Sequence, residues 1–332
     1  GGRRGGDVKR TVVAIVIGLA VVAVLTVITG IWLLRFRPLS VYGWTTRVAL
    51  ARAGLHKVSV SSPAGLQVVW TGGRGPVLVL LHGAGDQAGT WSRVVPALVK
   101  THTLVVPDLA GHGDSAPGRG PIEVKAVYEG VVAAIDTLAP GQRVIIVGNS
   151  LGGWMAMLVA RRRPERVAMV VCVDGGAIRG GNDPARVLPK TRTEARQSVA
   201  QTRDPKSAPI PDYVLDDIVR QATGGPLARF ASTASSMGAF VLDEAALREI
   251  KTPVRLIWGA SDRLMPLDYA RRMAAALPDV RLDIVDACGH VPQVECPDRF
   301  LTALWSALAG GAEHGSGAAS APALRNTKGV SP

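Results

Sequence analysis

The longest run of hydrophobic positions covers residues 11–34, TVVAIVIGLAVVAVLTVITGIWLL, and it contains no charged residue. A helix of this length rises ~1.5 Å per residue and measures about 36 Å, more than the ~30 Å hydrocarbon core of a bilayer. A signal peptide has a shorter apolar segment and a small-residue cleavage site, and no convincing site follows this run. We therefore expect a transmembrane helix over 11–34, with Trp32 near the lipid headgroups.

Basic residues flank this run on both sides. The positive-inside rule compares the two flanks, and here they nearly balance. We expect the N-terminus in the cytoplasm, which makes this a single-pass membrane protein with its body outside the cytoplasm. After the basic flank 1–10 and the helix, residues 35–56 mix apolar and basic positions and are expected to form a juxtamembrane linker or surface helix. The basic residues are Arg3, Arg4, Lys9 and Arg10 before the run, and Arg35, Arg37, Arg47 and Arg52 after it.

Beyond residue 57, short apolar runs alternate with segments of helical periodicity. Several runs are continuous Val/Ile/Leu stretches, as in parallel strands that are buried on both faces. The alternation predicts an α/β fold, a mostly parallel eight-stranded sheet with helices on both faces. The first two strands are too close together for a crossover helix and should form an antiparallel edge hairpin. The expected strands are 57–61, 66–70, 76–81, 103–107, 143–147, 168–174, 254–258 and 281–285, and the expected helices are 90–100, 122–138, 151–163, 267–277 and 297–308.

Two segments interrupt this alternation. Residues 178–250 contain no strong strand pattern but several short helical ones, which indicates a helical subdomain inserted into the sheet domain. The core domain then consists of 57–177 and 251–309. Residues 310–332 are rich in Gly, Ala, Ser and Pro, so we expect a disordered tail there.

Composition excludes several classes of protein. Hydrophobic residues make up 47% of the chain, too many for a disordered protein. The net charge is +12, but residues 1–57 hold nine Lys/Arg and one Asp, a net +8 around the apolar run. The remaining 29 basic and 25 acidic residues give only +4, without a basic stripe interleaved with aromatics. We expect no nucleic-acid partner, and a membrane contact through the apolar helix.

Three cysteines are too few for a disulfide framework or a Cys-rich zinc site. Cys172 lies in an apolar run and is expected in a buried strand. Cys288 and Cys296 are eight residues apart, so a disulfide between them is possible in an oxidising compartment. The simpler interpretation is two free thiols.

The sequence VGNSLGG at 147–153 contains the pattern G-x-S-x-G around Ser150. It follows the apolar run RVIIV and precedes the helical stretch WMAMLVARRR, which is the strand–turn–helix context of a nucleophile elbow. So tight a turn requires small neighbours, which Gly148 and Gly152 supply. Ser150 would stand at a helix N-terminus, where the helix dipole favours developing negative charge.

A serine nucleophile needs a base, and the base needs an acid to orient it. His290 stands just after the last strand, in DACGH, and loops at the carboxyl ends of parallel strands face the cleft. Asp262 follows the preceding strand, in WGASDR. The candidate catalytic residues are therefore Ser150, Asp262 and His290, in the chain order Ser, Asp, His.

These motifs together resemble the α/β-hydrolase fold superfamily, over residues 76–300. The resemblance implies an oxyanion hole made by the backbone N–H groups of Ala84 and Leu151, with His82 and Gly83 shaping its loop. It also implies that 178–250 forms a cap over the active site. The resemblance rests on the segments 82–85 (HGAG), 108–115 (DLAGHGDS), 148–153 (GNSLGG), 259–262 (GASD) and 289–292 (GHVP).

Some members of this superfamily place their acid after the sixth strand, where Asp174 stands, so Asp174 is the alternative to Asp262. Epoxide hydrolases and haloalkane dehalogenases of this fold have Asp at the elbow, and Ser150 disfavours those reactions. The resemblance favours an esterase or lipase-like enzyme that forms an acyl-enzyme from an apolar small-molecule carboxylic ester. Thioester and amide cleavage differ from this reaction only in the leaving group.

Two further functions stay open. The elbow G-N-S-x-G-G also resembles that of meta-cleavage hydrolases, which break carbon–carbon bonds. In those enzymes the loop after His-Gly usually runs Gly-Gly-Pro-Gly-Ala, whereas residues 84–89 here read AGDQAG. A non-catalytic binding protein is the other alternative, although it would not need all three triad residues. No metal-ligand or nucleotide motif is present, so we expect no metal and no cofactor.

Overall fold

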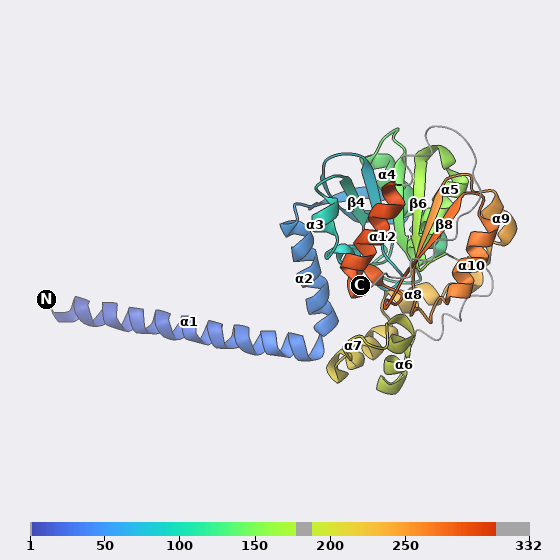
Figure 1. Ribbon diagram of the computed structural model, residues 1–332. Coiled ribbons are helices and arrows are strands. Elements are labelled where there is room, and N and C mark those ends of the chain that lie inside the picture. Colours follow the sequence, from blue (N-terminus) through green and yellow to red (C-terminus); the bar gives the residue numbers. More distant parts are fainter. Residues whose placement is uncertain (1, 177–187, 310–332) are drawn as a thin grey trace, which may run out of the picture.

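The computed structural model describes residues 2–176 and 188–309. Figure 1 shows an α/β body from which one long N-terminal helix extends. The first ten residues of the expected helical insertion, 178–187, and the tail expected at 310–332 are not among the described residues.

The body is built on one sheet with the strand order β1-β2-β4-β3-β5-β6-β7-β8. β1 pairs antiparallel with β2, and β2 pairs antiparallel with β4, whereas the six strands from β4 to β8 run parallel. The expected eight-stranded, mostly parallel sheet with an edge hairpin is confirmed. The strands are β1 (His56–Ser62), β2 (Gly65–Gly73), β3 (Val77–Leu81), β4 (Thr103–Pro107), β5 (Val144–Asn149), β6 (Val167–Val173), β7 (Val254–Gly259) and β8 (Val280–Val285).

Alternate residues of the central strands enter two separate hydrophobic cores. In β3, Val79 and Leu81 pack into one core and Leu78 and Leu80 into the other, as the two-residue period of a strand requires. One core is covered by α4 (Val124–Leu138), α5 (Leu151–Arg162) and α10 (Leu267–Ala276), and the other mainly by α12 (Pro297–Ala309). Burial on both faces explains why these strands read as continuous apolar runs.

The helix expected at 90–100 does not form as one element. The chain instead makes a short 3₁₀ helix, η1 (Ala88–Trp91), and a single turn, α3 (Val95–Leu98). Pro96 lies in the first turn of α3, the place where its missing N–H is tolerated. A continuous helix from residue 90 would put this proline in its interior, which explains the interruption.

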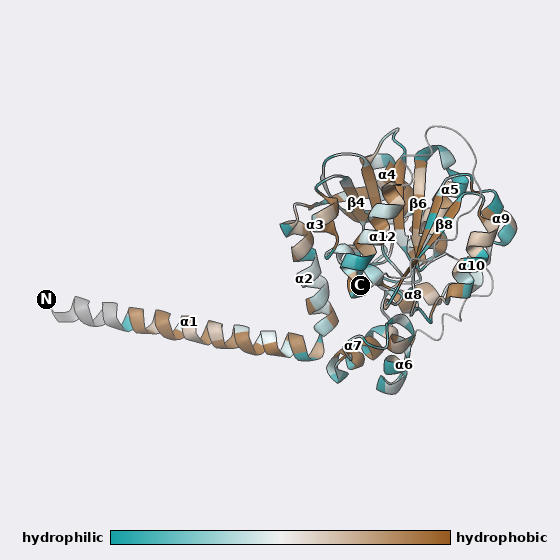
Figure 2. Ribbon diagram, in the orientation of Figure 1, coloured by the Kyte–Doolittle hydropathy of each residue, from teal (hydrophilic) through white to brown (hydrophobic). Residues whose placement is uncertain are grey.

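The N-terminal helix α1 (Gly2–Phe36) contains the stretch Val12–Phe36, which by length and composition could cross a membrane. None of this stretch is buried in the body, and Figure 2 shows hydrophobic residues along its length. α2 (Pro38–Arg52) follows almost at once and packs on the body, where Leu50 is completely buried. The side-chain amide of Gln87 donates to the carbonyl of Gly43 at 3.1 Å and ties α2 to the loop after β3.

Between β6 and β7 the described part of the insertion, 188–250, is entirely helical and irregular. It contains α6 (Arg192–Thr202), α7 (Asp212–Ala222), α8 (Pro226–Ala231), η4 (Ala234–Phe240) and α9 (Glu244–Arg248). Thr191 and Asp243 cap α6 and α9 by accepting backbone N–H groups, which is why these two helices begin where they do. The buried Asp217 on α7 accepts the backbone N–H of Leu39 at 3.0 Å, so the insertion also touches α2.

The turn from β5 into α5 leaves no room for side chains at two of its glycines. A Cβ added to Gly148 would lie 2.2 Å from the carbonyl carbon of Gly152, and one added to Gly152 would lie 2.2 Å from the carbonyl oxygen of Leu81. Ser150 stands between them at φ +54°, a strained angle for a residue with a side chain. Its N–H donates to the carbonyl of Val173 at 3.0 Å.

We expect Gly148→Ala to destabilise the protein by about 3 kcal/mol, because the new methyl group must displace the backbone of α5. The matched control is Gly118→Ala, at an exposed position with nothing within 4 Å of the added Cβ. Thermal unfolding of the full chain in detergent measures both variants. Equal unfolding midpoints for the two would contradict the close approach described here.

Candidate active site

Loops at the carboxyl ends of the parallel strands bring the three predicted catalytic residues to one edge of the sheet. Ser150 follows β5, Asp262 follows β7 and His290 follows β8. Ser150 is partly exposed, whereas Asp262 and His290 are 4% and 5% exposed. A partly accessible nucleophile beside a buried base and acid suits attack on a bound carbonyl compound.

His290 is oriented by Asp262. Its Nδ1 lies 2.7 Å from Oδ2 of Asp262. The other carboxylate oxygen accepts the backbone N–H groups of Leu264 at 2.8 Å and Met265 at 2.9 Å, so the carboxylate is held by three donors. A proton on Nδ1 leaves Nε2 free as the basic nitrogen. Asp262, and not the alternative Asp174, is therefore the carboxylate in contact with the candidate base.

Asn149 joins the serine turn to the histidine loop. Its side-chain amide donates to the carbonyl of His290 at 2.9 Å and to that of Val173 at 3.1 Å. The amide of Gln293, on the one-turn helix α11 (Pro292–Glu295), donates to Oδ1 of Asn149 at 3.1 Å. Sequence reasoning gave no role to either residue. The position of Asn149 directly before the nucleophile was the one available signal, because these bonds connect loops far apart in the chain.

No hydrogen bond joins the Ser150 hydroxyl directly to His290. Their relative position is set instead through Asn149 and through the bond from the Ser150 N–H to β6. Catalytic hydrogen bonds are often long in unliganded enzymes and shorten in the substrate complex.

Both expected oxyanion donors belong to segments that lie next to the serine. A Cβ added to Gly83 would come within 3.3 Å of the Ser150 Cβ, so the loop carrying Ala84 lies against the nucleophile. Leu151 is the first residue of α5, where backbone N–H groups have no partner within the helix. Among the described residues, neither N–H donates a hydrogen bond. Both are therefore available to an anionic oxygen.

His82 has a structural role. Its Nε2 accepts the backbone N–H of Leu109 at 2.9 Å, so Nδ1 carries the proton and donates to the carbonyl of Gly83 at 2.7 Å. Complete burial lowers the pKa of His82 to about 4. The neighbouring His112 is packed edge-on against it, and burial lowers the pKa of His112 to about 3. Both rings stay neutral and fully packed, which leaves His290 as the candidate base at this edge.

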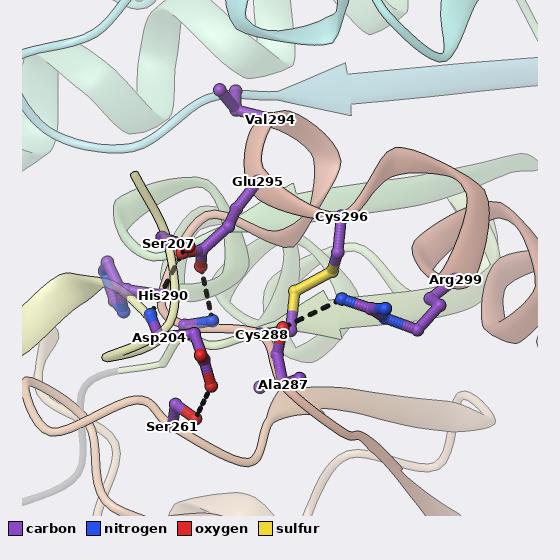
Figure 3. Close-up of a disulfide and its surroundings, with 12 residues drawn as sticks. Asp204, Ser207, Ser261, Ala287, Cys288, His290, Val294, Glu295, Cys296 and Arg299 are labelled. Atoms are coloured by element: carbon purple, nitrogen blue, oxygen red, sulfur yellow. Dashed lines mark hydrogen bonds between the residues drawn. A yellow bond between two sulfur atoms is a disulfide. The ribbon is translucent and has the colours of Figure 1, made fainter. Parts of the chain in front are cut away.

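A disulfide between Cys288 and Cys296 closes the loop that contains His290 (Figure 3). The interpretation of these residues as two free thiols is wrong. The turn of α11 folds the chain back on itself, so two cysteines eight residues apart meet with their Cα atoms at 6.1 Å. Cys172 is free and buried in β6, as expected.

Glu295, next to the disulfide, links this loop to the insertion. One carboxylate oxygen accepts the N–H of Gly289 at 2.6 Å. The other accepts the N–H of Asp204 at 2.9 Å and the hydroxyl of Ser207 (Figure 3). Asp204 in turn accepts the hydroxyl of Ser261, the residue before the candidate acid, at 2.5 Å. The segment after α6 is thus bonded to both loops that carry the acid and the base.

No cluster of three or more potential metal-ligating side chains is found in the described parts of the chain. The site offers a candidate nucleophile, a candidate base with its acid, and two backbone donors, an arrangement that suits acyl transfer.

Replacing both cysteines, as Cys288→Ser with Cys296→Ser, is expected to cost roughly 2–3 kcal/mol of stability, because the closed loop is short. The double variant should also be less active, since the loop carrying His290 loses its covalent closure. Thermal unfolding with and without reductant checks this. Reductant should lower the midpoint of the wild-type protein and leave that of the double variant unchanged, and an unaffected wild type would contradict the disulfide.

Comparisons with known proteins agree with this fold. A family model described as the alpha/beta hydrolase family matches residues 78–303. The pimeloyl-acyl-carrier-protein methyl ester esterase of Aromatoleum aromaticum is 32% identical over 251 residues, which cover 67% of this chain and 94% of that protein. A 2-hydroxy-6-oxononadienedioate/2-hydroxy-6-oxononatrienedioate hydrolase of Paraburkholderia phymatum is 30% identical over 256 residues, 69% of this chain and 86% of that protein.

Among solved structures, a membrane phospholipase A described as a bacterial virulence factor superimposes with a TM-score of 0.72 at 26% identity, covering 92% of this chain and 99% of the other. The matched family region contains Ala84, Ser150, Asp262 and His290. From the sheet, the elbow and these matches, the chain belongs to the alpha/beta hydrolase family.

Proposed function

We propose that this protein is a membrane-anchored serine hydrolase that cleaves carboxylic esters through Ser150, His290 and Asp262. The observation that carries the proposal is the buried His290–Asp262 pair at 2.7 Å beside a serine at φ +54° on a strand-to-helix turn. A protein that only binds ligands has no use for this combination of base, acid and strained nucleophile.

In the first half of the reaction, Nε2 of His290 takes the proton of the Ser150 hydroxyl as its oxygen attacks the ester carbonyl carbon. The carbonyl oxygen becomes an oxyanion, which the N–H groups of Ala84 and Leu151 stabilise. Asp262 stabilises the imidazolium and keeps its Nδ1–H in place. The intermediate then collapses, and His290 gives its proton to the departing alcohol, leaving an acyl group on Ser150.

In the second half, a water molecule takes the place of the alcohol. His290 removes a proton from this water as its oxygen attacks the acyl carbon, and the same two N–H groups bind the second oxyanion. Collapse releases the carboxylic acid and returns the proton to Ser150. Every group needed for both halves belongs to this chain.

The names of related proteins support an ester substrate. The Aromatoleum relative is named as a methyl ester esterase, and the solved structure that covers 92% of this chain is described as a membrane phospholipase A. An apolar N-terminal helix would hold the active site near lipophilic esters. We therefore place apolar small-molecule carboxylic esters first and the acyl esters of phospholipids as the extension to test.

Two features support an anchor with the body outside the cytoplasm. α1 is long and apolar enough to span a bilayer, and none of its span is buried in the body. The Cys288–Cys296 disulfide fits an oxidising compartment, whereas cytosolic thiols are kept reduced.

Carbon–carbon hydrolysis of the meta-cleavage type is the second candidate, because the Paraburkholderia relative at 30% identity is named as such a hydrolase. The same serine, base and oxyanion donors could serve that reaction. The loop at 84–89, AGDQAG, departs from the usual loop of those enzymes, so we place this function second.

We expect the full chain in detergent to hydrolyse p-nitrophenyl esters, and Ser150→Ala to lower kcat/KM by at least about 10³-fold. Ser59→Ala, at an exposed position on β1, is the matched control and should behave as wild type. Acyl chains of 2 to ~16 carbons and phospholipid vesicles would define the substrate range. A folded protein that turns over none of these esters but cleaves a 2-hydroxy-6-oxo-dienoate would replace this proposal with the second candidate. A folded protein that cleaves neither would favour a binding role.

The orientation of the protein in the membrane can be tested separately. In bacterial cells that express the full chain, the body should sediment with membranes after carbonate extraction, because α1 is the anchor. Protease added to intact spheroplasts should digest the body if it lies outside the cytoplasm. Protection of the body until the cells are lysed would reverse the proposed orientation.

A further inference from the structure

A second carboxyl group lies beside the candidate triad, and the mechanism above does not use it. Asp174 follows β6 directly and is completely buried. Its backbone is held at φ +43°, in the left-handed region that Asp and Asn tolerate better than most residues. The next residue, Gly175, approaches the serine so closely that an added Cβ would lie 2.6 Å from the Ser150 carbonyl oxygen. The buried Asp174 thus lies one residue from a backbone segment that packs against Ser150.

One residue stands between the two carboxyl groups. The N–H of Gly259 donates to Oδ1 of Asp174 at 2.8 Å, and the carbonyl of Gly259 accepts the N–H of Asp262 at 3.1 Å. The other oxygen of Asp174, Oδ2, is buried and accepts no hydrogen bond from any described residue. A buried carboxylate oxygen without a donor is costly, so this oxygen needs either a donor or a proton of its own.

The surroundings of Asp174 favour the protonated form of its carboxyl group. Burial first, and then the charge of Asp262, raise the pKa of Asp174 well above its usual value. Glu295, on α11, adds a further negative charge in the same direction. The thiol of Cys172, on β6, stays neutral because burial raises its pKa. The imidazole of His290 contacts Asp262 through Nδ1 at 2.7 Å, and the guanidinium of Arg203 lies 3.8 Å from Glu295. An ionised Asp174 would repel the charge of Asp262 in this buried interior.

We propose that Asp174 is a protonated carboxylic acid at neutral pH, and that its Oδ2–H donates to the Asp262 carboxylate and positions the acid of the triad. Asp174 would then be a positioning residue, acting through Asp262 rather than on the substrate. Its influence on turnover rests on the proposed function, but its protonation can be measured without any turnover.

Two substitutions separate the parts of this role. Asp174→Asn keeps the shape, tolerates the left-handed backbone and offers a side-chain N–H where the proposal places the O–H. Asp174→Gly also tolerates the backbone but removes the donor. Asp286→Asn, at an exposed position near the end of β8, is the control for the loss of an aspartate in general.

Stability against pH tests the protonation. A carboxyl whose pKa is raised on folding stabilises the protein below its unfolded pKa of ~3.9, and this contribution is lost as pH rises toward the folded pKa. The wild-type unfolding midpoint should therefore fall relative to Asp174→Asn by about 3 °C per pH unit from pH 4 to pH 7. The difference in unfolding midpoint between wild type and the Asp286→Asn control should not follow pH in this way. A difference between Asp174→Asn and wild type that stays constant above pH 5 would overturn the proposal.

Kinetics against pH test the positioning. The neutral Asn should retain most of kcat/KM and leave the acidic limb of the pH profile in place, because it changes no charge. Asp174→Gly should lower kcat/KM about tenfold. The acidic limb of its pH profile should move to higher pH, because Asp262 loses a hydrogen-bond donor and then attracts the protonated base more strongly. If Asp174→Asn instead moves the acidic limb to lower pH, Asp174 was ionised and the proposal is wrong.

The two experiments fail independently. An enzyme without ester hydrolysis but with the expected pH trend in stability would refute the proposed function and keep the protonated Asp174. An active esterase in which the stability difference between wild type and Asp174→Asn does not change with pH would support the proposed function and refute the protonated Asp174.

Discussion

The structure depends on the closeness with which helix α5 packs against strands β3 and β5. At Gly148 and Gly152 the backbones approach until a single added carbon would lie 2.2 Å from a backbone atom. This approach forces the chain to turn within one residue, and that residue is Ser150 at φ +54°. The strained backbone at Ser150 is maintained because β5 and α5, at the two ends of the turn, are both packed into the hydrophobic core.

Around that turn, contacts between distant parts of the chain assemble the rest of the site. Asn149 holds the histidine loop at one point, and Glu295 holds it at another through Gly289. The same Glu295 contacts the segment after α6, so the insertion between β6 and β7 is bonded to the site that it adjoins. The candidate base, acid and nucleophile come from separate loops, and their mutual geometry is therefore a property of the whole edge of the sheet.

Sequence alone predicts the sheet well because parallel strands buried on both faces leave an unmistakable apolar signature, as in residues 77–81. The site residues could be proposed because each stands just after such a strand, in a recognisable order. The interrupted helix at 90–100 was missed because apolar periodicity outweighed Pro96. The disulfide could not be decided, since the meeting of Cys288 and Cys296 depends on the turn of α11. The choice between Asp174 and Asp262 likewise needed the hydrogen bond to His290.

One feature at the other end of the molecule bears on how such an enzyme would meet its substrate. Only Arg37 separates the end of α1 from the start of α2, and α2 is packed on the body through Leu50 and bonded to α7 through Leu39. With α1 in a bilayer, the body would have no flexible linker that lets it move away from the membrane surface. Its search for substrate would become diffusion in two dimensions, and the relevant substrate concentration would be the number of molecules per area of membrane rather than per volume.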